Sequence, residues 1–321
     1  MEYAESIRDG RKIACPELKQ AVERFFRDLE NPEYELDAKG PEFCIQIIEK
    51  TMCHQQGEKL DGTPLRGTPF LLEPFHKFVV YNLLGFKLKE TDIVRFHEAL
   101  IFIPRKNVKT SFAAGLAWAL ALWYRRSGSK VYITSAALMQ SLESFNFLDY
   151  NIRRMGEDTK SGGKIKIIDN NNEHSMEATL PDGSFFIRAL AANPDSQDSL
   201  NCNIAIADEI HAFKKPKQYN LFKEAMKAYT NKLMIGISTA GDNEQAFLGQ
   251  RLKYCRKVLD GTVKDEQYFI FMCCAPEGVK DGSVDFTDPV VHEMANPAYG
   301  VSIRPEDILH DSLQAQTDPQ Q

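Results

Sequence analysis

The chain has 321 residues, of which 43% are hydrophobic and 26% charged, so a disordered chain is excluded and one large α/β domain, or a core with appendages, fits the length. Its longest apolar stretch, residues 112–124, is too short to cross a bilayer, and no signal peptide precedes it, so we expect no membrane association. The net charge of −6 disfavours tight nucleic-acid binding by one copy alone, and seven cysteines without paired spacing indicate buried free thiols in a reducing compartment.

The N-terminal part of the chain reads as helical. An amphipathic helix is predicted over 16–30 and a second around 41–52, and a loop punctuated by Gly, Thr and Pro leads to a helix from about Pro74. Strands and helices then alternate. Strands are expected at 98–103, 130–135, 164–169, 177–180, 184–190, 203–209, 232–239 and 266–274, and helices at 110–124, 139–155, 217–229 and 244–260. This alternation predicts a mostly parallel sheet covered by helices on both faces.

The segment "IFIPRKNVKT" (101–110) resembles a phosphate-binding loop that lacks its glycines. Lys109 and Thr110 lie between an apolar strand and an Ala-rich helix, but Ile103 and Val108 stand where the glycines belong. In such a loop, backbone N–H groups surround the phosphates, the lysine reaches the terminal phosphates and the hydroxyl holds Mg²⁺. The alternative is a basic turn whose Thr110 or Ser111 caps the helix.

Two further segments end strands with polar residues. "NIAIADEIH" (203–211) closes an apolar strand with Asp208 and Glu209, a pattern suited to holding Mg²⁺ and polarising a water; an acidic turn is the alternative. "GISTAG" (236–241) places Ser238 and Thr239 at the next strand end, where they either sense a terminal phosphate or form a tight turn. Three such segments in this order predict nucleotide hydrolysis.

The order of motifs from "PFLLEPFHKF" through "PRKNVKTSFAAGLAW", "IAIADEIHAF" and "ISTAGDN" to "HEMANPAYG" resembles the large terminase subunit of tailed bacteriophages, the ATP-driven motor that packages DNA. The resemblance implies an α/β P-loop NTPase of the ASCE type, with a central mostly parallel sheet flanked by helices and an N-terminal helical segment. It divides the chain into a helical extension with an adenine-side loop (1–72), the ATPase core (73–275) and an irregular segment leading towards a nuclease domain (276–321). We expect no nuclease activity from this sequence.

The resemblance also implies roles for individual residues toward ATP and Mg²⁺. Lys109 would bind the β- and γ-phosphates, Arg105 would stabilise charge in cis with Lys106 sharing that role, and Glu209 would orient the water. Thr110 and Asp208 would hold the metal. The remaining expected nucleotide contacts are Pro104, Asn107, Val108, Ser111, Phe75 and His76. Phe75 and His76 stand where relatives often have Trp-Gln for adenine, and Ser238, Thr239 and Ala240 would couple hydrolysis to movement.

Partners implied by the resemblance are double-stranded DNA, the portal protein of the procapsid, the small terminase subunit and further copies in a homo-oligomeric ring, in the host cytoplasm. An arginine from the next subunit would complete the site, with Arg188, Arg251 and Arg256 as choices. Two alternatives stay open: a DExH-type helicase, suggested by "DEIH", and a non-catalytic interaction module with a degenerate loop. Glu209 argues against the second, because a dead site does not need a water-activating residue.

Overall fold

The computed structural model describes residues 1–321 apart from 194–199, 242, 280 and 318–321. The helices of the described residues are α1 (Glu2–Arg8), α2 (Pro16–Glu30), α3 (Lys39–Thr51), α4 (Pro74–Gly85), α5 (Lys109–Trp123), α6 (Leu138–Met155), α7 (Pro216–Ala225), α8 (Phe247–Leu259), α9 (Pro289–Ala295) and α10 (Pro305–Ala315). The strands are β1 (Tyr34–Leu36), β2 (Phe86–Leu88), β3 (Glu98–Phe102), β4 (Ser129–Ser135), β5 (Lys166–Asp169), β6 (His174–Leu180), β7 (Gly183–Ala191), β8 (Ile204–Ala207), β9 (Leu233–Ser238) and β10 (Tyr268–Met272).

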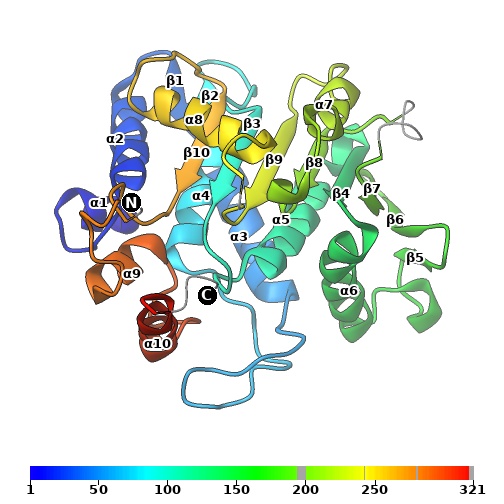
Figure 1. The fold of residues 1–321 in the computed structure, drawn as a ribbon. Coiled ribbons are helices and arrows are strands. Elements are labelled where there is room, and N and C mark those ends of the chain that lie inside the picture. Colours follow the sequence, from blue (N-terminus) through cyan, green and yellow to red (C-terminus); the bar gives the residue numbers. More distant parts are fainter. Residues whose placement is uncertain (194–199, 242, 280, 318–321) are drawn as a thin grey trace.

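An eight-stranded sheet forms the centre of the molecule (Figure 1). Its strand order is β10-β3-β9-β8-β4-β7-β6-β5, and β1 pairs with β2 in a separate two-stranded sheet. The strands from β10 to β7 are parallel, whereas β6 and β5 add an antiparallel extension at one edge. All the parallel strands therefore end at one edge, where ligands of open α/β sheets bind.

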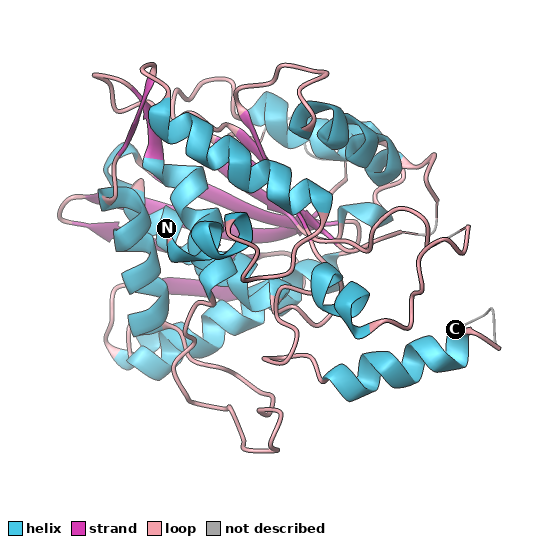
Figure 2. Cartoon of the chain, turned by 90° about the vertical axis from the view of Figure 1, so that its left-hand side faces the viewer, coloured by secondary structure: helices cyan, strands magenta, loops and turns pink. Residues whose placement is uncertain are grey.

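Helices cover both faces of this sheet, and Figure 2 shows them above and below the strands. On one face, α3 to α6 pack against strand residues such as Ile133 and Ile235. On the other face, α7 and α8 pack against residues of the opposite parity, such as Tyr132 and Met234. Because side chains alternate across a strand, a strand buried on both faces reads as a continuous apolar run. The predicted fold class is confirmed.

The strands and helices predicted between residues 98 and 274 are all present, with ends shifted by a few residues. The sequence did not indicate α1 or the short β1 and β2. The segment 276–321, expected to be irregular, contains α9 and α10. Pro289 and Pro305, which look like loop punctuation in the sequence, occupy the first turns of these helices, where proline needs no hydrogen-bond acceptor. Among the described residues, no helix combines the length and apolarity that a membrane crossing requires.

Candidate nucleotide-binding site

The loop between β3 and α5 has the backbone shape of an anion-binding loop without its glycines. Lys106 and Val108 both adopt left-handed conformations, with φ of 68° and 57°. Val108 precedes the first residue of α5 and provides no side-chain cap. Within the described part of the chain, the backbone N–H groups of residues 105–111 donate no hydrogen bond. The loop and the first turn of α5 therefore present unsatisfied donors, as an anion site requires.

Lys109 begins α5 and is almost fully buried, at 6% exposure. Its Nζ donates a hydrogen bond to the carbonyl of Pro104 at 2.9 Å. Burial lowers the pKa of Lys109, and the nearby carboxylates of Glu209 and Asp208 oppose that shift. The lysine and the acidic pair therefore lie in one electrostatic environment, as the sequence predicts.

The sheet order explains how the loop and the acidic pair face one another. β9 lies between β3 and β8, so two strand spacings, about 10 Å, separate the two segments. The N–H of Ile103 donates to the carbonyl of Ser238 at 3.1 Å and ties the end of β3 to the end of β9. The N–H of Asp208 donates to Thr134 of β4 at 2.7 Å. The loop and the acidic pair therefore lie on either side of the end of β9.

Asp208 follows β8 and is buried, with 3% of its surface exposed. Desolvation by burial, followed by repulsion from the neighbouring Glu209 carboxylate, raises its pKa to about 7. The N–H of Glu209 and the charge of Lys109 act in the opposite direction. Among the residues that the structure describes, no cationic side chain is bonded directly to this carboxylate. It therefore suits coordination of a divalent ion, which supplies the missing charge.

Glu209 is held by residues of β9 and by a histidine. Its backbone is left-handed, with φ of 50°. Its Oε2 accepts hydrogen bonds from the Thr239 N–H at 3.4 Å and the Thr239 hydroxyl at 3.3 Å. The same oxygen lies 3.0 Å from Nδ1 of His211, and the His211 N–H donates to the Ser238 hydroxyl at 3.1 Å. The end of β9 thus orients the carboxylate that we expect to act on water.

Comparison with known protein families identifies the class to which this fold and site belong. Residues 74–257, more than half of the chain, match the family model described as terminase large subunit, ATPase domain. The chain belongs to this family. The match selects the terminase class over the helicase alternative.

Individual proteins resemble this terminase chain over different lengths. The large terminase of bacteriophage HK97 shares the fold with a TM-score of 0.66 and 21% identity over 87% of this chain and 52% of that chain. Protein YmfN of Escherichia coli K12 is 30% identical over 118 residues, which are 37% of this chain and 25% of YmfN. The large terminase of a thermophilic bacteriophage gives a TM-score of 0.39 at 10% identity over 55% of this chain and 40% of that chain. The present chain therefore spans about half the length of the HK97 protein.

The predicted site residues of this terminase domain differ in how far they are exposed to solvent. Arg105 and Lys106 are exposed, and Pro104, Val108, Thr110 and Ser111 are half-buried around the first turn of α5. Ser238 and Thr239 are buried beside Glu209, whereas Ala240 is exposed.

Phe75 and His76 lie apart from this arrangement, with exposures of 2% and 1%. The His76 ring packs at a tilt between the rings of Phe75 and Phe112, at centroid distances of 3.9 and 4.4 Å, and burial lowers its pKa to about 3. In this structure neither side chain is available to an adenine base. We propose instead that they support the start of α5, to which Phe112 belongs.

Two polar residues near the terminase site were not assigned a specific role from the sequence. Asn107, expected only as one of several loop contacts, is fully buried and hydrogen-bonded to residues near the C-terminus. Ser135 ends β4 one residue beyond the pair Thr134 and Ala207, so it is the cross-strand neighbour of Asp208 on the same face. Its buried hydroxyl has no hydrogen-bond partner in the described part of the chain. A serine at the end of a predicted strand is the only sequence feature that could have suggested it.

Two arginines considered for action on a neighbouring subunit are engaged within their own chain. Arg251 lies 3.1 Å from Oε1 of Glu98, and its guanidinium group stacks on aromatic rings, including that of Tyr219. Nε of Arg256 bonds Oε1 of Glu17 at 2.8 Å. Both side chains contribute to intramolecular packing in this structure.

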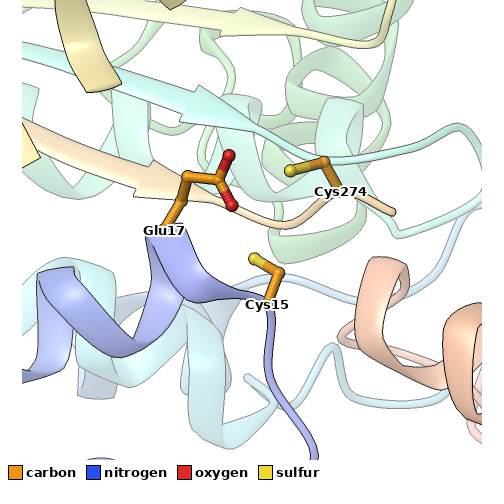
Figure 3. A group of neighbouring side chains, drawn as sticks. All are labelled: Cys15, Glu17 and Cys274. Atoms are coloured by element: carbon orange, nitrogen blue, oxygen red, sulfur yellow. The ribbon is translucent and has the colours of Figure 1, made fainter. Parts of the chain in front are cut away.

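All seven cysteines are free thiols, and six are buried, as the sequence predicts. The fold brings Cys15 and Cys274 together with Glu17, with ligand atoms within 4.8 Å of one another (Figure 3). Arg256 already neutralises the Glu17 carboxylate, and the Cys15 thiol donates to the Met272 carbonyl at 3.2 Å. This polar cluster therefore joins the start of α2 to the end of β10 without requiring a metal ion.

Proposed function

We propose that this chain hydrolyses ATP in a Mg²⁺-dependent reaction and that it is the motor of a bacteriophage packaging machine. One observation carries the proposal. Lys109 from the loop after β3 and the acidic pair after β8 share one environment at the carboxyl edge of the sheet, with β9 between them. Family membership supports the same activity.

Each residue has a proposed role in the reaction. The free N–H groups of residues 105–111 and the Lys109 amine bind the phosphates, and Arg105 stabilises the charge that develops on the transferred phosphoryl group. Glu209 orients the attacking water and accepts its proton. Thr239 fixes the Glu209 carboxylate by hydrogen bonds. Binding of the terminal phosphate beside the end of β9 would therefore move the coupling segment, Ser238 to Ala240.

The residues present fit a magnesium ion. Its oxygen ligands would be the Thr110 hydroxyl and the Asp208 carboxylate, and Ser135 lies beside Asp208 with an unpartnered hydroxyl. The ion would neutralise phosphate charge. Because Asp208 has a raised pKa, ion binding would favour its deprotonated form.

Family membership supports a proposal about the biological setting. We propose that several copies form a ring on the portal protein of a procapsid, in the host cytoplasm, receive DNA with the help of the small terminase subunit and move double-stranded DNA inward. Because the net charge of the chain is −6, contact with DNA would have to come from local basic patches or from several copies of the chain acting together.

The test is phosphate release from ATP by the purified chain and by Lys109→Ala and Glu209→Ala. We expect Lys109→Ala to lose both ATP binding and turnover. Glu209→Ala should still bind ATP, but its turnover should be slower than that of the wild type by a factor of roughly 100 or more. The assay is repeated with procapsids and linear DNA, so that an arginine supplied by a neighbouring subunit is present. Equal, negligible rates for all three proteins under both conditions, with no ATP binding, would establish the non-catalytic module instead.

A further inference from the structure

The phosphate-binding loop is hydrogen-bonded to a segment that is distant in the sequence. Asn107, in the middle of the loop, has no exposed surface. Its Nδ2 donates to Oδ1 of Asn296 at 3.0 Å, and its Oδ1 accepts from the N–H of Ala298 at 3.0 Å. Both ends of one amide are thus bonded to the segment after α9. We call Asn107, Asn296 and Ala298 the loop clasp.

Asn107 also shapes its own loop. Its Nδ2 lies 3.2 Å from the carbonyls of both Pro104 and Arg105. The two hydrogens of the Asn107 amide are therefore shared among three acceptors, two carbonyls of the loop and the side chain of Asn296. A buried asparagine with every polar atom engaged can hold only one arrangement of the backbone around it.

The outer half of the clasp is itself rigid. Asn296 ends α9, and its Nδ2 donates to the His292 carbonyl at 2.9 Å, so the side chain is held by the helix end. Ala298 is fully buried in the larger apolar core. The Ser302 hydroxyl adds a hydrogen bond to the Lys106 carbonyl at 2.9 Å. Figure 1 shows α9 and α10, on either side of this segment, beside one another.

The loop needs such support because of its sequence. Lys106 and Val108 adopt left-handed backbone conformations that glycine adopts at little cost, and Val108 is β-branched, for which this region is strongly unfavourable. A strained conformation persists only where the surroundings determine it. Asn107 lies between the two strained residues, and its side chain is hydrogen-bonded to Asn296 and Ala298.

We propose that the loop clasp is a positioning device that replaces the missing glycines. Asn296 and Ala298, acting through Asn107, hold Lys106 and Val108 in the left-handed region and keep the loop N–H groups aimed at the phosphate site before a nucleotide arrives. Neither Asn296 nor Ala298 touches the nucleotide in this account. The inference rests on the proposed phosphate-binding role of the loop, but the shape of the loop can be measured without ATP.

The experiment compares Asn296→Ala with the wild type in the whole chain, by two readouts. Amide hydrogen exchange at Ala298 and Phe112, whose N–H groups donate to Asn107 and to the Val108 carbonyl, should become at least tenfold faster without nucleotide. The Kd for ATP should rise about tenfold, because the loop must be ordered on binding. In the Val108→Gly background, where one of the two left-handed residues no longer needs support, Asn296→Ala should raise the Kd by a smaller factor, about threefold relative to Val108→Gly alone.

A matched control is Asn151→Ala. Asn151 is also fully buried and bonded to backbone groups, at Cys53 and Phe147, but it is not part of the clasp. This variant should lose stability, but exchange at Ala298 and Phe112 should match the wild type, and its effect on the Kd should be the same in the Val108 and Val108→Gly backgrounds. If Asn296→Ala does not fold, Asn296→Leu, which keeps a side chain of similar size but lacks the oxygen that accepts from Asn107, takes its place.

The outcomes separate the two proposals. Unchanged exchange at Ala298 and Phe112 in Asn296→Ala, or an equal loss of ATP affinity in the Val108 and Val108→Gly backgrounds, would overturn the clasp. Absence of ATP binding in the wild type would refute the proposed function, and the exchange measurement would still decide whether the clasp shapes the loop.

Discussion

The carboxylate of Glu209 and the hydroxyl of Thr239 lie 3.3 Å apart, although they follow different strands of the sheet. The Thr239 N–H reaches the same oxygen at 3.4 Å. Because β8 and β9 are adjacent and parallel, their carboxyl ends lie next to each other and place the carboxylate beside the hydroxyl. This pair gives the first of four predictions.

Thr239→Val should slow hydrolysis while leaving ATP binding nearly intact. Valine keeps the shape of threonine, but Glu209 loses one hydrogen bond and retains the one from the backbone N–H. We expect kcat to fall roughly tenfold, equivalent to about 1.4 kcal/mol. Thr239→Ser, which keeps the hydroxyl, is the control and should lie near the wild type. A raised Kd for ATP with an intact kcat would show that the hydroxyl contacts nucleotide instead of Glu209.

Asp208→Asn should stabilise the metal-free protein at high pH. The pKa of Asp208 in the folded chain is about 7, above the ordinary 3.8, so the folded state binds this proton more tightly than the unfolded state. Stability therefore falls as the pH rises from about 4 to 7, by roughly 4 kcal/mol at most. Urea unfolding in EDTA should show the variant more stable at pH 8 and nearly equal to the wild type at pH 4. The same difference at both pH values would contradict this.

His76→Phe should remove part of the acid sensitivity. The pKa of His76 is lowered to about 3 from 6.5 by burial, so the unfolded state binds the proton first and stability falls as the pH drops below 6.5. Between pH 6.5 and 4.5 this group costs the wild type roughly 2 kcal/mol, which the variant should not lose. Urea unfolding at both pH values measures the difference. A changed preference between ATP and GTP in the variant would instead show that His76 contacts the base, as the sequence led us to expect.

Arg251→Ala should destabilise the isolated chain by roughly 2–4 kcal/mol, because Glu98 loses a buried partner and the rings of Tyr219 and Phe247 lose a stacked guanidinium group. Arg251→Lys keeps the charge without the planar group and should fall in between. Urea unfolding measures all three proteins. An arginine acting on the next subunit would behave differently: stability of the isolated chain would be unchanged and only turnover in the assembled ring would fall.

The sequence by itself determined the fold class and the three segments that carry chemistry. Apolar strands such as 203–207 alternate with helices, and that pattern allows few arrangements other than a parallel sheet with covered faces. Since parallel strands end at one edge, the position of Lys109 and of Asp208 directly after strands was enough to predict that they lie near each other.

Only the tertiary structure decided how these segments are held. The order of the strands placed β9 between β3 and β8, and so put Thr239 against Glu209. Packing around α5 buried Phe75 and His76, whose types alone suited a base contact. The bond between Asn107 and Asn296 joins residues that are 189 positions apart. Local sequence patterns report hydrogen bonds and burial within a few residues, whereas these contacts arise only when distant segments pack together.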